Sequence, residues 1–141
     1  MTVSTEIMDR VRTSFAAQTM MQTLGAELVE IGAGNVIISA PILPGSRQQQ
    51  GAAHAGLAFS IGDSAAGYSA LTLMPLDQEV MTVEMKINLL SPGLGDRLVA
   101  EGRVVKSGRR ITVVQSDVFA ETGDTRKHIA TLQGTMIPVA L

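Results

Sequence analysis

The sequence has no cysteine and no tryptophan, and its aromatic residues are one tyrosine and three phenylalanines among 141 residues. Without cysteine, neither a disulfide framework nor a thiolate metal site can form. So few aromatic rings argue against a surface that stacks nucleic-acid bases. The formal net charge of −2 argues the same way, because a nucleic-acid interface needs clustered Lys and Arg. We therefore expect no nucleic-acid partner.

The sequence also lacks the signals of secretion, membrane insertion and cofactor binding. Residues 1–6 have no basic run followed by an apolar one, so we expect a cytoplasmic protein. The apolar stretch 53–68 contains His54 and Asp63 and has no flanking basic anchors, which argues against a membrane span. His54 and His128 are far apart in the sequence, and no G-x-x-x-x-G-K run occurs. We therefore expect no metal and no cofactor.

One carboxylate stands out among what is present. Asp63 is the only charged residue between Arg47 and Asp77, and its neighbours are small or apolar. Removing a carboxylate from water costs several kcal/mol unless it is paired, hydrogen-bonded or neutralised. Asp63 is therefore a candidate functional residue. The alternative is a structural acid that bonds to a loop or to a neighbouring serine.

Hydrophobic periodicity and turn residues predict the order of the elements. They are a helix from Ser4 to Gly25, strands over 26–31 and 36–42, a central helix over 53–73, and strands over 80–90, 97–106, 109–121 and 127–139. Period-two alternation with short glycine turns indicates that the last four strands form an antiparallel meander. In the strand 80–90 we expect one face to carry Met81, Val83, Met85, Ile87 and Leu89.

The central helix decides the predicted architecture. A single, nearly all-apolar helix beside one antiparallel sheet is best accommodated if the sheet curls around it. Gly56, Gly62 and Gly67 would permit close approach, which offsets the roughly 1 kcal/mol that each helical glycine costs against alanine. We predict one α+β domain over residues 1–141, with a curled antiparallel sheet wrapped around one long central helix and an additional N-terminal helix.

Four segments together resemble a known family. They are residues 24–32, the run His54-Ala55-Gly56 with Asp63 nine residues after the histidine, residues 83–92, and residues 101–110. In order and spacing they are similar to the hotdog-fold acyl-CoA thioesterases of the PaaI-like, phenylacetate-pathway type. The resemblance covers nearly the whole chain and implies a hotdog fold.

The resemblance also implies roles for individual residues. The backbone N–H groups of His54-Ala55-Gly56 would hold the thioester carbonyl, and Asp63 would act as nucleophile or as general base on water. Gln48 occupies the position of a common asparagine, and Thr82 matches an assisting Ser or Thr. Ala55 replaces a usual glycine, so Ala55 and Gln48 depart from the family pattern.

The spacing of these groups has a physical consequence. Helix N-termini present unpaired N–H groups and a partial positive charge, which suit a developing oxyanion. Ala55 and Asp63 are eight residues apart, or about 12 Å along one helix axis. A reacting carbonyl must lie within about 3 Å of both its donors and its nucleophile. If both groups are catalytic, we expect a site shared by antiparallel helices of a homodimer, two sites per dimer.

The setting of Asp63 also predicts its acidity. An apolar environment should raise the pKa of its carboxyl and make the ionised form a stronger base. Donors such as Ser64, or Thr82 of a partner, would moderate that rise. His54 is assigned to positioning rather than to acid–base catalysis.

Coenzyme A would be part of the substrate, and its phosphates need exposed cations. The candidates are Arg47 and the predicted hairpin Lys106, Ser107, Gly108, Arg109 and Arg110. The expected activity is hydrolysis of a medium-chain or aromatic acyl-CoA by a homodimer, itself expected to form a dimer of dimers. Two alternatives remain open: a hotdog hydratase or dehydratase that pairs His54 with the acid, and a non-catalytic module that binds acyl-CoA.

Overall fold

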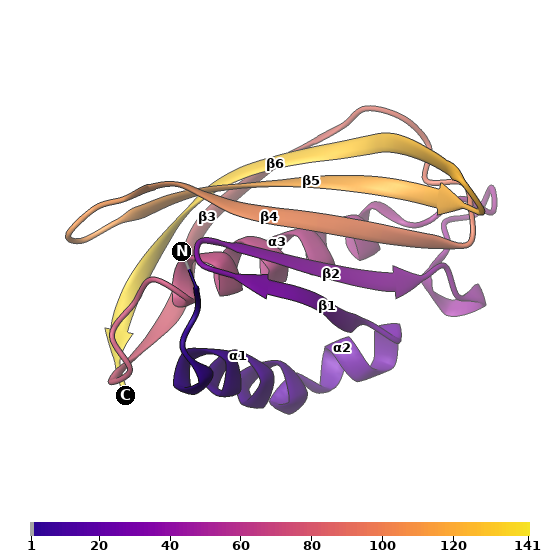
Figure 1. Cartoon of the computed structure of the whole chain (residues 1–141). Helices are drawn as coiled ribbons and strands as arrows, with labels where there is room; N and C mark the ends of the chain where they lie inside the picture. The colour runs from indigo at the N-terminus through magenta and orange to yellow at the C-terminus, as the bar shows by residue number, and fades with distance from the viewer. Residues whose placement is uncertain (1) are drawn as a thin grey trace.

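The computed structural model describes residues 2–141 (Figure 1). Its elements in chain order are α1 (Thr5–Ala17), α2 (Thr19–Leu24), β1 (Glu27–Gly32), β2 (Asn35–Pro41), a short 3-10 helix η1 (Pro44–Ser46), α3 (Ala55–Leu71), β3 (Gln78–Leu89), β4 (Arg97–Ser107), β5 (Thr112–Thr122) and β6 (Thr125–Ala140). All strand pairs are antiparallel, in the order β1-β2-β4-β5-β6-β3. The sheet curls around α3, so the predicted α+β hotdog fold is confirmed.

The sheet order corrects one prediction. Strands β4, β5 and β6 form the expected meander, but β3 pairs with β6 and lies at the far edge of the sheet. The segment between β3 and β4 is not a tight turn: Leu90 N–H donates to Ile129 O, and Gly93 O accepts from Ala53 N–H. These bonds fasten the segment beside the start of α3. The chain therefore crosses to β2, and β4 pairs there instead of returning along β3.

A bulge divides β3 into two parts with different inward faces. Thr82 pairs with Met136 and Glu84 with Thr135, so Val83 is an extra residue between them. Alternation reverses at such a residue. Met85 and Ile87 pack against the core as predicted, whereas Met81 and Val83 are 53% and 57% exposed. The expectation of one continuous apolar face along β3 is therefore wrong, and Thr82 faces inward instead of Met81.

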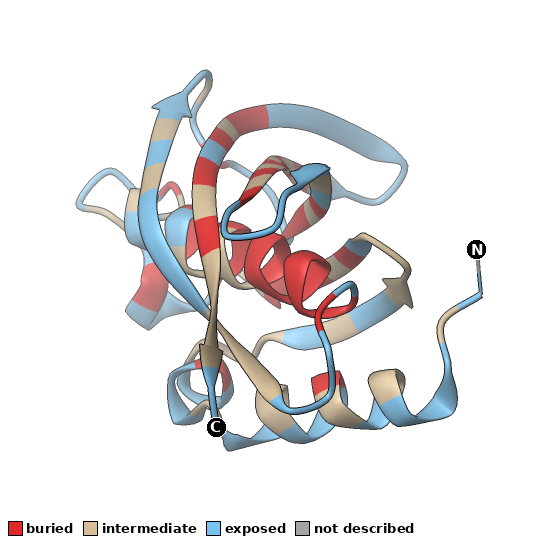
Figure 2. Cartoon of the chain, turned by 90° about the vertical axis from the view of Figure 1, so that its left-hand side faces the viewer, coloured by how far each residue is buried: buried red, intermediate tan, exposed pale blue. Residues whose placement is uncertain are grey.

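Helix α3 is buried by the sheet over most of its surface (Figure 2). Its apolar composition drives this burial because each buried apolar side chain contributes about 1.5–3 kcal/mol. The close approach of α3 to the sheet depends on glycines in both the helix and the sheet. A Cβ at Gly62 would lie 3.0 Å from Leu132, and one built on Gly102 of β4 would lie 2.4 Å from the backbone of Ala65. The sheet glycine is thus the tighter contact, and the sequence pattern did not single it out.

The N-terminal helix differs from its prediction by one interruption. Ser4 caps α1 by accepting a hydrogen bond from Ile7 N–H, and Gly25 ends α2 in the left-handed region. Between them, Gln18 has extended backbone angles and separates α1 from α2. Arg10 of α1 donates to the carbonyls of Leu71 and Met74, which fastens α1 to the end of α3. Within residues 2–141 the longest apolar helix is too short to cross a bilayer.

Candidate active site

Asp63 lies on α3 at the edge of a cavity of about 310 Å³, which we call the Asp63 cavity. Thr82 of the same chain, on β3, donates a hydrogen bond of 2.9 Å to Asp63 Oδ1. The prediction that a partner's Thr82 would do so is therefore wrong, because the bulge at Val83 turns Thr82 inward. Asp63 Oδ2 has no hydrogen-bond partner within residues 2–141. Among the described residues, one carboxylate oxygen is therefore held by a hydrogen bond and the other is not.

Burial raises the pKa of the Asp63 carboxyl above its ordinary value, and the hydrogen bond from Thr82 partly opposes that rise. The expected direction is confirmed. A less acidic carboxyl is a stronger base once it is ionised. The site therefore contains a carboxyl group with a raised pKa, that of Asp63, and one hydroxyl donor bonded to it, that of Thr82.

The start of α3 is built differently from its prediction. His54 is the N-cap residue in extended conformation, so it precedes the first turn instead of belonging to it. Its Nδ1 accepts a 2.8 Å hydrogen bond from Gly56 N–H, and its carbonyl accepts from Leu57 N–H. Helix capping thus uses two amides of the first turn. In the described part of the chain, Ala55 N–H is the first-turn amide left without a partner.

A second cavity, of about 500 Å³, adjoins Ala55. We call it the Ala55 cavity; it is lined by residues of the loop before α3, by the first turn of α3 and by the segment 89–93. Gln48 lies in this wall, and its side-chain oxygen accepts from Gln50 N–H. That bond orients the amide and leaves its NH2 group as the donor available to a carbonyl. The Ala55 cavity therefore offers donors and no carboxylate.

The two cavities share no lining residue, and Ala55 and Asp63 are separated by eight positions of the same rigid helix. One described chain therefore brings His54, Ala55, Gly56 and Gln48 together at one end. It brings Asp63 and Thr82 together elsewhere. It does not bring the two groups to one point.

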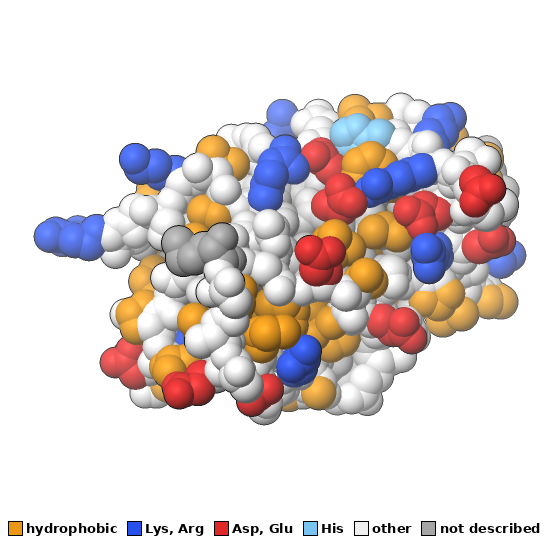
Figure 3. Space-filling model, in the orientation of Figure 1, with side chains coloured by type: hydrophobic (Ala, Val, Ile, Leu, Met, Phe, Trp, Pro, Cys, Tyr) orange, Lys and Arg blue, Asp and Glu red, His pale blue; other side chains and the backbone are white. Residues whose placement is uncertain are grey.

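The candidate phosphate-binding residues are divided as well. Arg47 lies before α3, where its guanidinium donates to Ile42 O. The β4–β5 hairpin protrudes at the opposite end of the molecule from Arg47 (Figure 1). Its exposed residues include the other candidates, Lys106, Ser107, Gly108, Arg109 and Arg110. Figure 3 shows Lys and Arg side chains at that protruding end.

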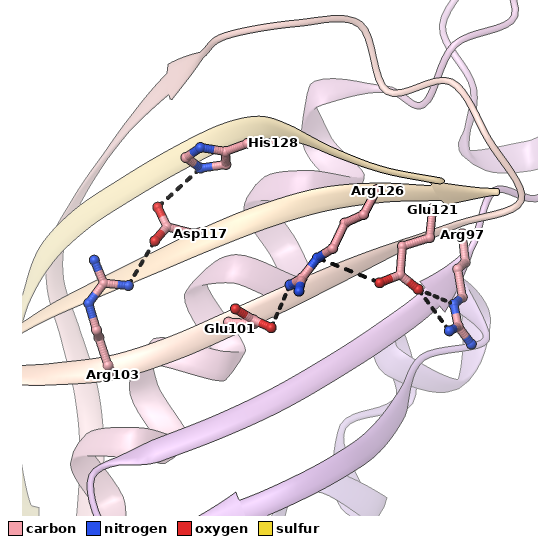
Figure 4. A network of polar contacts seen from close by, with 7 residues as sticks. All are labelled: Arg97, Glu101, Arg103, Asp117, Glu121, Arg126 and His128. Carbon is pink, nitrogen blue, oxygen red and sulfur yellow. Dashed lines mark hydrogen bonds and ion pairs between the residues drawn. The ribbon is translucent and has the colours of Figure 1, made fainter. Parts of the chain in front are cut away.

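The outer face of the sheet carries a charged network that the sequence did not indicate (Figure 4). Arg103 contacts Asp117 at 2.8 Å, and His128 Nε2 lies 3.1 Å from Asp117. Burial alone would raise the pKa of Asp117, but hydrogen bonds from Arg103 and Thr131 and the nearby positive charges lower it overall. The His128–Asp117 pair lines neither the Asp63 cavity nor the Ala55 cavity. We assign it to the surface of the sheet.

Sequence reasoning missed several residues that line the Asp63 cavity, among them Ser14, Gln18 and Tyr68. Tyr68 is the one tyrosine of the chain and lies in the helix that contains Asp63, which was an available signal. Ser14 and Gln18 come from α1 and its end. Nothing in their local sequence indicates that they face the cavity, because their position depends on how α1 crosses α3.

Comparison with known proteins identifies the family. Residues 50–127 match the family described as the Thioesterase superfamily. A thioesterase family protein from Silicibacter pomeroyi is 37% identical, with 96% of this chain and 99% of that chain covered and a TM-score of 0.93. A protein of Saccharolobus solfataricus named as a candidate esterase is 27% identical over 99 residues, 70% of each chain.

A more distant structure supports the fold. The E. coli PaaI protein from the phenylacetic acid degradation operon is 16% identical, with 99% of this chain and 97% of that chain covered and a TM-score of 0.87. At that identity the likeness concerns the fold alone. Together with the family match and the relative from Silicibacter pomeroyi, these findings mean that the chain belongs to the Thioesterase superfamily of thioester hydrolases and has the hotdog fold.

Proposed function

We propose that the protein hydrolyses a medium-chain or aromatic acyl-CoA to the free acid and coenzyme A. In this proposal Asp63 of one protomer and Ala55 N–H of a second copy act on the same thioester. Gln48, His54, Gly56 and Thr82 position these two groups. The observation that carries the proposal is the narrow accessible stripe of α3.

That stripe contains both candidate groups. The residues of α3 that retain access are Ala55, Gly56, Phe59, Ser60, Asp63 and Ser64. All other residues of the helix are buried. Positions spaced by four residues share one helix face, and Phe59, 37% exposed, lies midway between Ala55 and Asp63. A two-fold axis near Phe59 would set Ala55 opposite Asp63 of a second copy, and the reverse at the same time.

The edge strand β3 supports a second copy as the partner. It is twelve residues long and ends the sheet, with Met81, Val83 and Leu89 exposed along it. A long apolar edge strand is an aggregation hazard unless another strand pairs with it. Pairing with β3 of a second copy would continue the sheet and bring the accessible stripes of the two α3 helices together. Association of two such dimers stays a prediction.

The chemistry follows from the two groups. Asp63 either attacks the thioester carbonyl directly or removes a proton from the water that attacks it. The oxygen that becomes negative accepts from Ala55 N–H at the positive end of the helix dipole. Collapse of the tetrahedral intermediate expels the thiolate of coenzyme A, which takes up a proton. If water attacked, collapse gives the free acid directly. If Asp63 attacked, the acyl group remains on Asp63 as a mixed anhydride, which water then hydrolyses to the free acid and the regenerated carboxylate. Water is the second reactant, and no cofactor is required.

The same dimer would gather the basic residues. Because the two helices run antiparallel, Arg47 of one protomer would approach the β4–β5 hairpin of its partner. Lys106, Arg109 and Arg110 are exposed there and would contact the coenzyme A phosphates as the predicted cations. The apolar pantetheine arm would enter between them along the strand edges.

A thiol-release assay over a panel of acyl-CoA thioesters tests the proposal. We expect Asp63→Asn to lower kcat by about a thousandfold and to retain acyl-CoA binding. Asp124→Asn, in the exposed β5–β6 turn, removes an equal charge away from the site and should leave kcat unchanged. Hydration of an enoyl-CoA would support the hydratase instead. Binding without any product, in the unaltered protein, would support the non-catalytic module.

A further inference from the structure

The Asp63 cavity has a polar end wall made by the N-terminal segment. Where α1 ends, Gln18 leaves the helical conformation, and its Nε2 donates a 2.6 Å hydrogen bond to the hydroxyl oxygen of Tyr68. Ser14 Oγ lies 3.1 Å from the same oxygen. All three side chains line the Asp63 cavity. We call Ser14, Gln18 and Tyr68 the end-wall cluster.

The end-wall cluster retains hydrogen-bonding capacity. A tyrosine hydroxyl has one donor hydrogen and two acceptor sites, and a glutamine amide has two donors and one carbonyl acceptor. Within residues 2–141, Gln18 Oε1 and the second hydrogen of its Nε2 have no partner. The ring of Tyr68 is buried against Phe15, at 6.2 Å between ring centroids. The buried ring therefore fixes the hydroxyl in place, at the wall of the cavity.

The composition of the cavity disfavours a purely alkyl occupant. Its lining includes Glu79 and Thr82 besides the end-wall cluster, and Val80 is its one aliphatic side chain larger than a methyl group. An alkyl chain would displace water from these polar groups without replacing its hydrogen bonds, which costs about 1–3 kcal/mol for each group left unsatisfied. A site that hydrogen-bonds a substrate hydroxyl discriminates strongly against the analogue that lacks it.

Building on the proposed function, we propose that the end-wall cluster recognises a hydroxyl group at the distal end of the acyl chain. The carbonyl of the thioester is at Asp63, and Asp63 lines the same cavity as the cluster. Tyr68 follows Asp63 by five residues, about 7.5 Å along the axis. The cavity volume of about 310 Å³ is near the lower limit for small-ligand sites, which excludes long acyl groups. The substrate class is therefore an acyl-CoA of at most medium length with a distal hydroxyl.

A structural role for the same residues makes a different prediction. If the end-wall cluster only fastened α1 to α3, its loss would lower the Tm and affect all substrates equally. A recognition role changes the ratio of two kcat/KM values, for an acyl-CoA with a terminal hydroxyl and for the same acyl-CoA without it. The ratio is insensitive to a uniform loss of folded protein.

The experiment measures that ratio for butyryl-, hexanoyl- and octanoyl-CoA and their terminally hydroxylated counterparts. We expect the protein to favour the hydroxylated member of at least one pair by about tenfold, the effect of one good hydrogen bond. Gln18→Ala and Tyr68→Phe should each bring the ratio close to one by lowering kcat/KM for the hydroxylated member of the pair. Gln22→Ala, on the adjacent short helix and bonded to Ala16 O, is the matched control and should not change the ratio.

Binding separates this inference from the proposed function. Non-hydrolysable thioether analogues with and without the hydroxyl are titrated calorimetrically into the protein and into Gln18→Ala. Hydroxyl-dependent binding that Gln18→Ala abolishes supports the inference whether or not thioesters are hydrolysed. Turnover with equal kcat/KM within every pair, or equal binding of the two analogues, overturns the inference and leaves the proposed hydrolysis intact. Absence of thioester turnover overturns the proposed function alone.

Discussion

The two ends of the accessible stripe of α3 present different kinds of chemical group, a backbone amide at Ala55 and a side-chain carboxylate at Asp63. In the proposed mechanism the group at Ala55 is a backbone amide, whose position follows from the start of the helix and from the capping bonds of His54. At Asp63 the group is a single side chain, held by Thr82 across the bulge of β3. A backbone donor tolerates changes of side chain, so the proposed mechanism permits alanine where the resemblance implies a usual glycine. The carboxylate has no such tolerance.

The strongest test of this difference is to remove the backbone donor, Ala55 N–H, and leave the carboxylate of Asp63 in place. Ala55→Pro does so, because proline lacks an N–H and is favoured at the first position of a helix. His54 is already extended, as the residue before a proline prefers to be. We expect kcat to fall by about a hundredfold or more, the effect of losing one oxyanion donor. Ala55→Gly retains the amide and should retain most of the activity in the same thiol-release assay.

Combining the two defects tests whether the groups come from different protomers. A heterodimer of one Asp63→Asn chain and one Ala55→Pro chain, purified with two affinity tags, would contain one intact site and one site with both defects. We expect about half of the wild-type kcat per dimer. If both groups acted within one protomer, neither site would be intact. The heterodimer would then be as inactive as its parents.

Removing the hydrogen bond to the carboxylate should have a smaller effect than Ala55→Pro. Thr82→Val removes the hydrogen bond that opposes the rise in the pKa of Asp63, so that pKa should rise further. In the proposed mechanism the ionised carboxyl is the active form, so activity should be lost as the pH falls through this pKa. The acidic limb of the kcat–pH profile should therefore move to higher pH, with a loss of about tenfold at neutral pH. Thr82→Ser keeps the hydroxyl, and its profile should match the wild type.

The smallest effect concerns stability. The pKa of Asp63 is higher in the folded chain than its ordinary value, so the folded state binds the proton more tightly than the unfolded state. Folding stability therefore falls as the pH rises from the ordinary aspartate pKa through the raised one. Asp63→Asn should raise the Tm by a few degrees at neutral pH, measured by calorimetry. The difference should vanish at a pH below the ordinary pKa, and a Tm difference independent of pH would contradict it.

The sequence predicted local structure better than pairing. Ser4 and Gly25 marked the ends of the N-terminal helical segment because capping depends on neighbouring residues. The apolar run around Asp63 predicted the enclosed helix because a helix that is apolar over most of its surface is buried best by a sheet wrapped around it. The partner of β3 was not predictable in this way. Alternation indicates that a segment is a strand, but the crossing of the segment after Leu90 depends on contacts with Ile129 and Gly93, distant in sequence.

In the candidate site too, features that depend on local sequence were predictable and features that depend on packing were not. Asp63 was identified as a candidate from its isolation among apolar residues, and the separation of Ala55 and Asp63 followed from helix geometry. The use of Gly56 N–H by His54 was missed, since a histidine ring is not the usual cap of a helix. Gln18 was missed for another reason. Its role depends on the crossing of α1 over α3, which no local pattern of residues records.

Gly102 determines the depth at which α3 is seated in the sheet. With no side chain there, β4 reaches the backbone of Ala65, two residues beyond Asp63. Even a methyl group there would push the helix outward, and in the proposed dimer the carboxylate would move with it toward the second copy. Under the proposed function, Gly102 therefore sets the width of the gap between the two copies from behind the helix.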